Sequence, residues 1–76
     1  MNLKTIHNVF FVGIGGIGMS ALARYFQYVG KNVAGYDRVQ SPITSELEEK
    51  GIQVHFEDDL DLIPSSFKSK QETLVV

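Results

Sequence analysis

Short apolar runs alternate with longer amphipathic stretches along the 76 residues of the chain. Runs that fit strands of a sheet lie at residues 8–12, 32–36, 52–56 and 73–76. The first of them is almost wholly apolar, which is typical of a parallel strand buried on both faces. The pattern therefore predicts four strands, with room for a helix after each of the first two.

Two helices are expected between the first three strands. Residues 16–29 place apolar side chains at helical spacing, and Gly30 is a typical terminating residue. The Ser-Pro pair at 41–42 is typical of an N-cap and first helical position. The second helix is expected to run to about Lys50, with Gly51 ending it. The apolar face expected for the first helix is Ile17, Ala21, Leu22, Tyr25, Phe26 and Val29.

This alternation predicts an α/β fold, with a Rossmann-like parallel sheet, flanking helices and right-handed crossovers. The acidic segment 57–64 is expected to form a surface turn. The chain stops within the expected fourth strand, with no closing helix after it. We therefore expect residues 1–76 to be a single domain, truncated in its fourth strand, at the N-terminal end of a larger enzyme.

A glycine-rich segment, Gly13-Ile-Gly-Gly-Ile-Gly18, joins the first strand to the first helix. A helix N-terminus offers unpaired N–H groups and partial positive charge, and glycine lets a ligand approach the backbone. The segment therefore predicts a phosphate cradle, with Gly16 near the ligand. Gly18 is expected where the helix crosses the first strand closely. Asp37 lies 19 residues after Gly18 at the end of the second strand, where dinucleotide-binding domains place a ribose-binding acid.

Other polar residues give weaker signals. Ser20 lies on the second turn of the expected helix without a nearby base in the sequence, so we interpret it as a polar ligand contact rather than a nucleophile. His7 and His55 lack partners at metal-ligand spacing, and the acids at 57–61 do not follow a calcium-loop pattern. We expect no catalytic residue and no metal site in this chain.

Charge is distributed unevenly, although the net charge is only −2. Residues 1–38 contain four basic residues and one acid, and residues 39–76 contain three basic residues and eight acids. The basic half carries the glycine segment, which suits an anionic ligand, and the acidic half argues against nucleic-acid binding. Cysteine is absent, and no apolar run approaches the length of a membrane span. We expect a cytoplasmic protein.

The glycine segment and its continuation, Met19-Ser20-Ala21-Leu22-Ala23, resemble the start of the Mur ligases, the amide-forming ligases of peptidoglycan synthesis. Gly16 and the Met19-Ser20 pair distinguish the segment from ordinary dinucleotide-binding turns. The resemblance extends through residues 33–37, Leu47, 51–52 and 73–76, and so covers essentially the whole chain. Within the family it is strongest to the ligases that join L-alanine to UDP-N-acetylmuramate.

The resemblance implies a three-domain cytoplasmic enzyme that forms an acyl-phosphate with ATP and Mg²⁺ and then an amide with L-alanine. Its N-terminal domain holds the UDP part of UDP-N-acetylmuramate, and ATP binds the central domain, outside this chain. By the same resemblance, Asp37 faces the uridine or ribose. We assign Arg38, next to it, to the same side, where neutralising a phosphate and lying in solvent are both open. The residues implied to line the diphosphate are Gly15, Gly16, Ile17, Gly18, Met19 and Ser20.

Two departures from the family pattern affect the uridine side. Tyr36 stands where members often have Ser, and Asp58 stands where many have His. A related ligase that recycles murein tripeptide shares the domain type and ranks second within the family. Outside it, a nicotinamide-dependent oxidoreductase domain and an α/β module without a ligand stay open alternatives.

Overall fold

The computed structural model describes residues 5–69 and 71–76, so Lys4 and Lys70 of the charge count lie outside the described residues. Four strands form one sheet: β1 (Asn8–Val12), β2 (Asn32–Tyr36), β3 (Gln53–His55) and β4 (Thr73–Val75). Each neighbouring pair is parallel, and the order is β3-β2-β1-β4. The predicted α/β, Rossmann-like sheet is confirmed.

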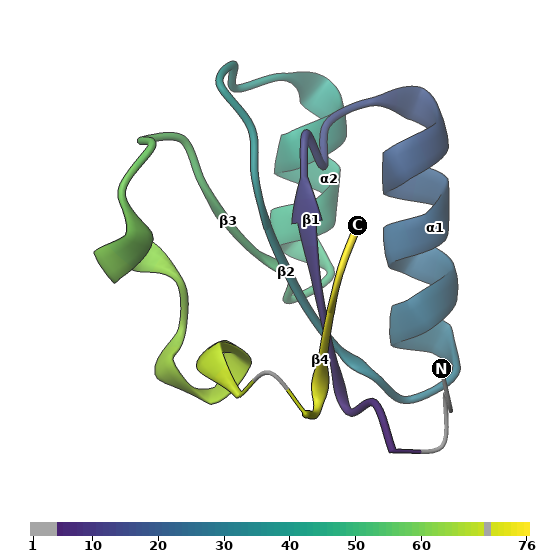
Figure 1. Cartoon of the computed structure of the whole chain (residues 1–76). Coiled ribbons are helices and arrows are strands. Elements are labelled where there is room, and N and C mark those ends of the chain that lie inside the picture. Colours follow the sequence, from purple (N-terminus) through teal and green to yellow (C-terminus); the bar gives the residue numbers. More distant parts are fainter. Residues whose placement is uncertain (1–4, 70) are drawn as a thin grey trace.

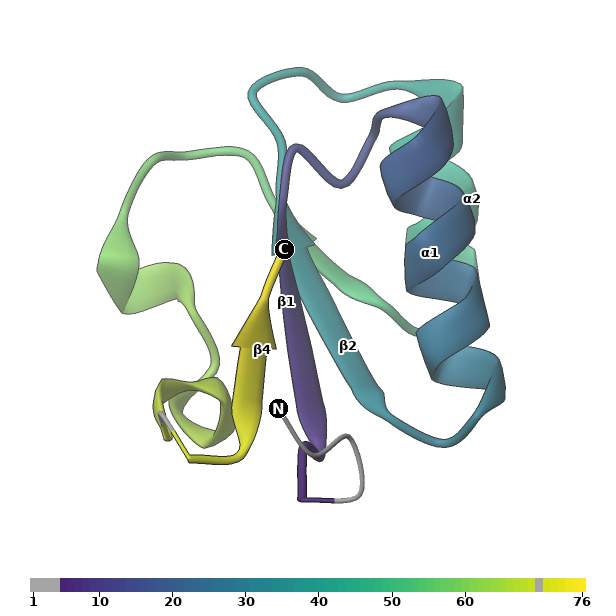
Figure 2. The same ribbon diagram turned by 45° about the vertical axis from the view of Figure 1, so that its right-hand side comes forward.

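The two predicted helices are α1 (Ile17–Tyr28) and α2 (Pro42–Glu49), and they cover the same face of the sheet (Figures 1 and 2). Ser41 is the N-cap of α2 with Pro42 at its start, as predicted. Gly30 and Gly51 follow the two helices with φ of 94° and 88°. Glycine adopts this left-handed backbone without steric cost, which is why both helices end there.

The segment after β3 is more ordered than the expected surface turn. It contains two short 3-10 helices, η1 (Leu60–Leu62) and η2 (Ser65–Lys68), and runs along the sheet face opposite the α-helices (Figure 2). The ring of Phe67 in η2 meets the Phe10 ring edge-on, with centroids 6.4 Å apart. This ring contact and the hydrogen bond that the Asn8 side chain donates to the Ser66 carbonyl oxygen hold η2 against the sheet.

The core lies between the sheet and the two α-helices. Val9 and Phe11 point toward the helices and are fully buried, together with Leu47 of α2 and Ala23 of α1. Ile14, in the glycine segment, is also fully buried. This residue anchors the loop that follows β1 into the core.

The expected apolar face of α1 is wrong for most of its members. Ile17 is 82% exposed, and Ala21, Leu22, Tyr25 and Val29 are also exposed. Only Phe26 of that set packs against the core. The helix instead turns the small residues Ser20 and Ala23 to the sheet, because small side chains allow a helix backbone to lie close to its neighbours. The spacing of apolar residues therefore predicted the wrong buried face of α1.

Candidate functional site

The glycine segment lies at the carboxyl end of β1, where the strand order reverses. β1 pairs with β2 on one side and with β4 on the other, and the chain reaches β4 only after passing through β3. In open α/β sheets, ligands bind outside the carboxyl ends of the strands at such a switch point. The topology therefore places the predicted cradle where this fold class builds its binding sites.

Backbone hydrogen bonds fix the start of the loop. The N–H groups of Gly13 and Ile14 both donate to the Tyr36 carbonyl oxygen, at 2.7 and 3.0 Å. Gly13 has φ of 80°, a conformation that favours glycine. The loop therefore turns over the end of β2 rather than continuing along β1.

The close approach expected at Gly18 is at Gly35 instead. A Cβ at Gly18 meets nothing within 4 Å, so the expectation for Gly18 is wrong. At Gly35 a Cβ lies 2.6 Å from Cδ1 of Ile14 and 2.9 Å from the Phe11 carbonyl oxygen. The buried Ile14 side chain occupies the space over β2, so the strand glycine is the one that cannot carry a side chain.

Helix α1 begins with its N–H groups uncapped by any side chain. Gly16 is the N-cap in extended conformation, with φ of −67° and ψ of 151°. The first N–H groups of a helix have no intrahelical acceptor, which here means those of Ile17, Gly18 and Met19. Gly18 has open space around it and the Ile17 side chain faces solvent. The helix end is therefore accessible to an anion.

Three of the predicted diphosphate residues already use their N–H groups. Gly15 donates to Oδ2 of Asp37 at 2.8 Å, and Gly16 donates to the Gly13 carbonyl oxygen at 3.1 Å. Ser20 is buried. Its hydroxyl donates to the Ile17 carbonyl oxygen, and its N–H donates to the Gly16 carbonyl oxygen. The polar atoms of Ser20 thus have partners within the helix.

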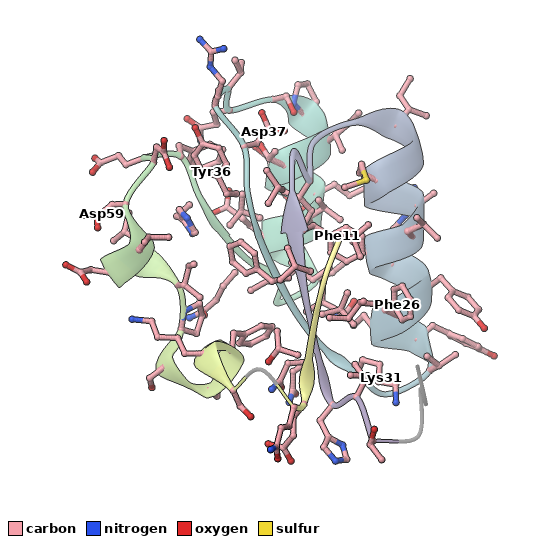
Figure 3. All side chains as sticks on the ribbon, in the orientation of Figure 1. Phe11, Phe26, Lys31, Tyr36, Asp37 and Asp59 are labelled. Atoms are coloured by element: carbon pink, nitrogen blue, oxygen red, sulfur yellow. The ribbon has the colours of Figure 1, made fainter. Side chains whose placement is uncertain are left out.

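Asp37 lies directly after β2 at the same end of the sheet (Figure 3), and Arg38 is the next residue of the chain. The Asp37 side chain points toward the glycine segment, and its second oxygen, Oδ1, accepts from the Val39 N–H at 3.0 Å. Arg38 is exposed. The structure therefore brings the sequence-predicted acid to the predicted loop, through a backbone contact that the sequence did not indicate.

Thr44 is a neighbour of this site that the sequence analysis missed. It is fully buried at the start of α2, and its Cγ2 lies 3.0 Å from a Cβ built on Gly15. The Ser41 hydroxyl accepts from the Thr44 N–H, while Thr44 Oγ1 accepts from the Ser41 N–H. The spacing of a capping box at 41–44 was the available signal for it.

The weaker candidates lie elsewhere. His7 is exposed and 3.8 Å from a Glu72 carboxylate oxygen. His55 packs against the rings of Phe10 and Tyr36, with centroids 5.8 and 5.5 Å away.

Among the described residues no group of three or more His, Asp or Glu side chains is arranged to hold a metal ion. The same part of the chain has no helix long and apolar enough to cross a membrane.

A family model described as "Mur ligase family, catalytic domain" matches residues 8–75. The chain belongs to the Mur ligase family. It is 63% identical over its whole length to the UDP-N-acetylmuramate–L-alanine ligase of Flavobacterium psychrophilum and 62% identical to that of Flavobacterium johnsoniae. The enzyme of that name from Porphyromonas gingivalis is 59% identical over 68 residues, or 90% of the chain.

This Mur ligase chain spans about a sixth of the length of those relatives. It covers 17% of each Flavobacterium enzyme and 15% of the Porphyromonas enzyme. The matched residues include the whole glycine segment, both α-helices and all four strands. The family resemblance drawn from the glycine segment is therefore confirmed.

Proposed function

We propose that this chain is the part of a Mur ligase that binds the diphosphate of UDP-N-acetylmuramate. The whole ligase would join L-alanine to UDP-N-acetylmuramate in peptidoglycan synthesis. The names of the relatives support the substrates. The observation that carries the diphosphate site is the uncapped N-terminus of α1 at the switch point of the sheet. Three adjacent N–H groups and the helix dipole suit a phosphate oxygen.

Within this proposal the residues have different positions. The N–H groups of Ile17, Gly18 and Met19 face the diphosphate, Gly15 shapes the turn beneath it, and Gly16 lies beside the ligand at the N-cap of α1. Ser20 supports the helix from behind, since its polar atoms are bonded within α1. Asp37 and Arg38 belong to the uridine and ribose side.

ATP and Mg²⁺ belong to the proposed reaction but not to this chain. The glycine segment contains no lysine of the kind that phosphate loops for ATP carry, and the described residues offer no metal-binding cluster. We place both in regions of the longer enzyme, together with the L-alanine site and the central and C-terminal domains. A cytoplasmic location is part of the same proposal.

An NMR titration of the chain tests the ligand. UDP-N-acetylmuramate, or UDP alone, is expected to shift the amide signals of residues 15–20 in a saturable manner, and NAD is expected to do so more weakly. Stronger saturable binding of NAD at the same amides would contradict the proposal and favour the oxidoreductase alternative.

The 76-residue chain is expected to be inactive by itself. With UDP-N-acetylmuramate, L-alanine, ATP and Mg²⁺ present, it should release no phosphate and form no amide, because its glycine segment lacks the lysine of an ATP phosphate loop. Phosphate release that depends on both substrates would contradict this assignment.

A further inference from the structure

We propose that Asp37 is a positioning residue that holds the glycine segment in its ligand-binding shape, whatever it also contacts on the uridine side. The inference rests on the proposed function, because it concerns how the same diphosphate site is built. It assigns to the Asp37 carboxylate a task that does not involve touching the nucleotide.

The contacts of Asp37 tie two loops together. Oδ2 accepts from the N–H of Gly15 at 2.8 Å, and Oδ1 accepts from the N–H of Val39 at 3.0 Å. The first contact bridges 22 residues of sequence. One carboxylate thus fixes the loop after β1 relative to the loop after β2 (Figure 3). Hydrogen bonds to a charged acceptor are stronger than those between neutral groups.

Gly15 is also confined on its side-chain face. A Cβ there lies 2.7 Å from Oδ2 of Asp37 and 3.0 Å from Cγ2 of Thr44. Thr44 is fully buried and is fixed by its hydrogen bonds to Ser41 at the start of α2. Gly15 therefore lies between a carboxylate and the beginning of a helix, and the absence of its side chain makes this fit possible.

This arrangement decides which N–H groups a phosphate meets. With Gly15 donating to Asp37 and Gly16 donating to Gly13, the groups left for a ligand are those of the first turn of α1. A loop already held in this shape loses less conformational freedom when the ligand binds. Removing the carboxylate should therefore weaken diphosphate binding, although a negative charge has been removed.

Whether the affinity for pyrophosphate falls or rises in Asp37→Ala distinguishes a positioning role from simple charge repulsion. A carboxylate near a diphosphate repels it, so without a positioning role Asp37→Ala would strengthen the binding of inorganic pyrophosphate. Positioning predicts the opposite: binding of pyrophosphate, which has no uridine, becomes about tenfold weaker. The matched control is Asp59→Ala, which removes a carboxylate that accepts the Asp61 N–H in a different turn.

Pyrophosphate and UDP are titrated separately into the parent chain, Asp37→Ala and Asp59→Ala. Binding is monitored by the shifts of the amide signals of α1. We expect weaker binding of both ligands by Asp37→Ala only, with faster hydrogen exchange at the Gly15 amide. If UDP binding weakens while pyrophosphate binding is unchanged or tighter, Asp37 is only a uridine contact and the inference is overturned. A parent chain that binds neither ligand would overturn the proposed function, and the inference with it.

Gly15→Ala provides an independent variant if Asp37→Ala folds poorly. Its Cβ should displace the Asp37 carboxylate and weaken pyrophosphate binding to a similar extent. Because the two substitutions break one contact, the double variant should bind about as weakly as either single variant, a non-additive result expected of directly interacting residues. If the double variant loses affinity for pyrophosphate by the product of the two single-variant factors, the proposed coupling between Asp37 and Gly15 is wrong.

Discussion

At the scale of single residues, the glycines of this chain have separate physical tasks. Gly13 supplies a positive φ, Gly15 lies against Asp37, and Gly35 makes room for Ile14. The sequence motif predicted the position of the loop correctly. It did not predict which glycine is tightly packed, because that depends on a buried isoleucine folding back over the neighbouring strand.

Gly35→Ala is expected to lower the free energy of unfolding by about 1–3 kcal/mol, the usual cost of overpacking a core. The added methyl group would lie within 2.9 Å of the Ile14 side chain and the Phe11 backbone, so one of them must move. Urea denaturation measures the loss. The matched control is Gly18→Ala, which enters open space in the first turn of α1 and should leave stability unchanged or raise it by up to about 1 kcal/mol, because alanine is the better helix former. Equal effects of the two substitutions would contradict the packing described for Gly35.

At the scale of elements, the N-terminus of α2 depends on one local motif. The Ser41 hydroxyl accepts from the Thr44 N–H at 3.2 Å, and Thr44 Oγ1 accepts from the Ser41 N–H at 2.9 Å. Thr44 Oγ1 also donates to the Ser41 carbonyl oxygen. This cap holds the buried Thr44 beside the glycine segment, and so links helix stability to the site.

Ser41→Ala is expected to reduce the free energy of unfolding by about 1 kcal/mol, the typical cost of losing an N-cap. The substitution leaves the Thr44 N–H without its acceptor at the start of the helix. Ser45→Ala, at an exposed position of the same helix, serves as the control and should stay within about 0.5 kcal/mol of the parent. The urea midpoints of the three proteins provide the comparison, and an unchanged midpoint for Ser41→Ala would show that the cap does not stabilise α2.

Elements with strong local signals were predicted well, and the others were not. The bounds of β1 and β2 agree with the sequence analysis, and those of the helices agree within one residue. β3 is shorter than expected, at Gln53–His55 instead of 52–56. The helices η1 and η2 were missed because one turn of 3-10 helix has no periodicity to detect. The position of η2 depends on contact with Phe10, which lies far away in the sequence.

At the scale of the whole molecule, a polar network joins parts that are distant in the sequence. Asn8, buried in β1, donates to the Ser66 carbonyl oxygen at 2.9 Å and to Thr73 Oγ1 at 3.4 Å. Its own Oδ1 accepts from Asn32 at 3.0 Å. A single side chain thereby connects β1, β2, β4 and η2 at the end of the sheet opposite the glycine segment.

Asn8→Ala should lower the free energy of unfolding by about 1–3 kcal/mol, because the buried Asn8 side chain makes three hydrogen bonds that the variant loses. Hydrogen exchange should increase most at the amides that hold β4 to β1, including that of Val76, which donates to the Phe10 carbonyl oxygen. Asn32→Ala removes only the contact from an exposed residue and is expected to cost less. If the β4 amides of Asn8→Ala are as well protected from hydrogen exchange as those of the parent, Asn8 does not have this role.

The site combines features from all three scales: an uncapped helix, a loop shaped by glycines and a sheet whose order reverses at β1. The sequence predicted this location because strand, glycine segment and helix follow one another directly. It could not predict the contacts of Gly15 with Asp37 and Thr44, which depend on how the loops after β1 and β2 meet. Family membership then supplied the proposed nucleotide.

The most direct test of the account is the affinity of Gly16→Val for UDP. A Cβ at Gly16 makes only ordinary contacts, 3.5 Å or more from its neighbours, and φ there suits any residue. The variant should therefore stay folded, losing about 1 kcal/mol because Val is a poor N-cap. Gln53→Val, at an exposed position of the edge strand β3, is the control.

UDP is titrated into the three proteins while the amide signals of Ile17, Gly18 and Met19 are followed. The parent and Gln53→Val should show the same saturable shifts, and Gly16→Val should show none, because its side chain fills the approach to the helix N-terminus. If folded Gly16→Val binds UDP with the affinity of the parent, the diphosphate does not bind at this loop and the central claim is wrong.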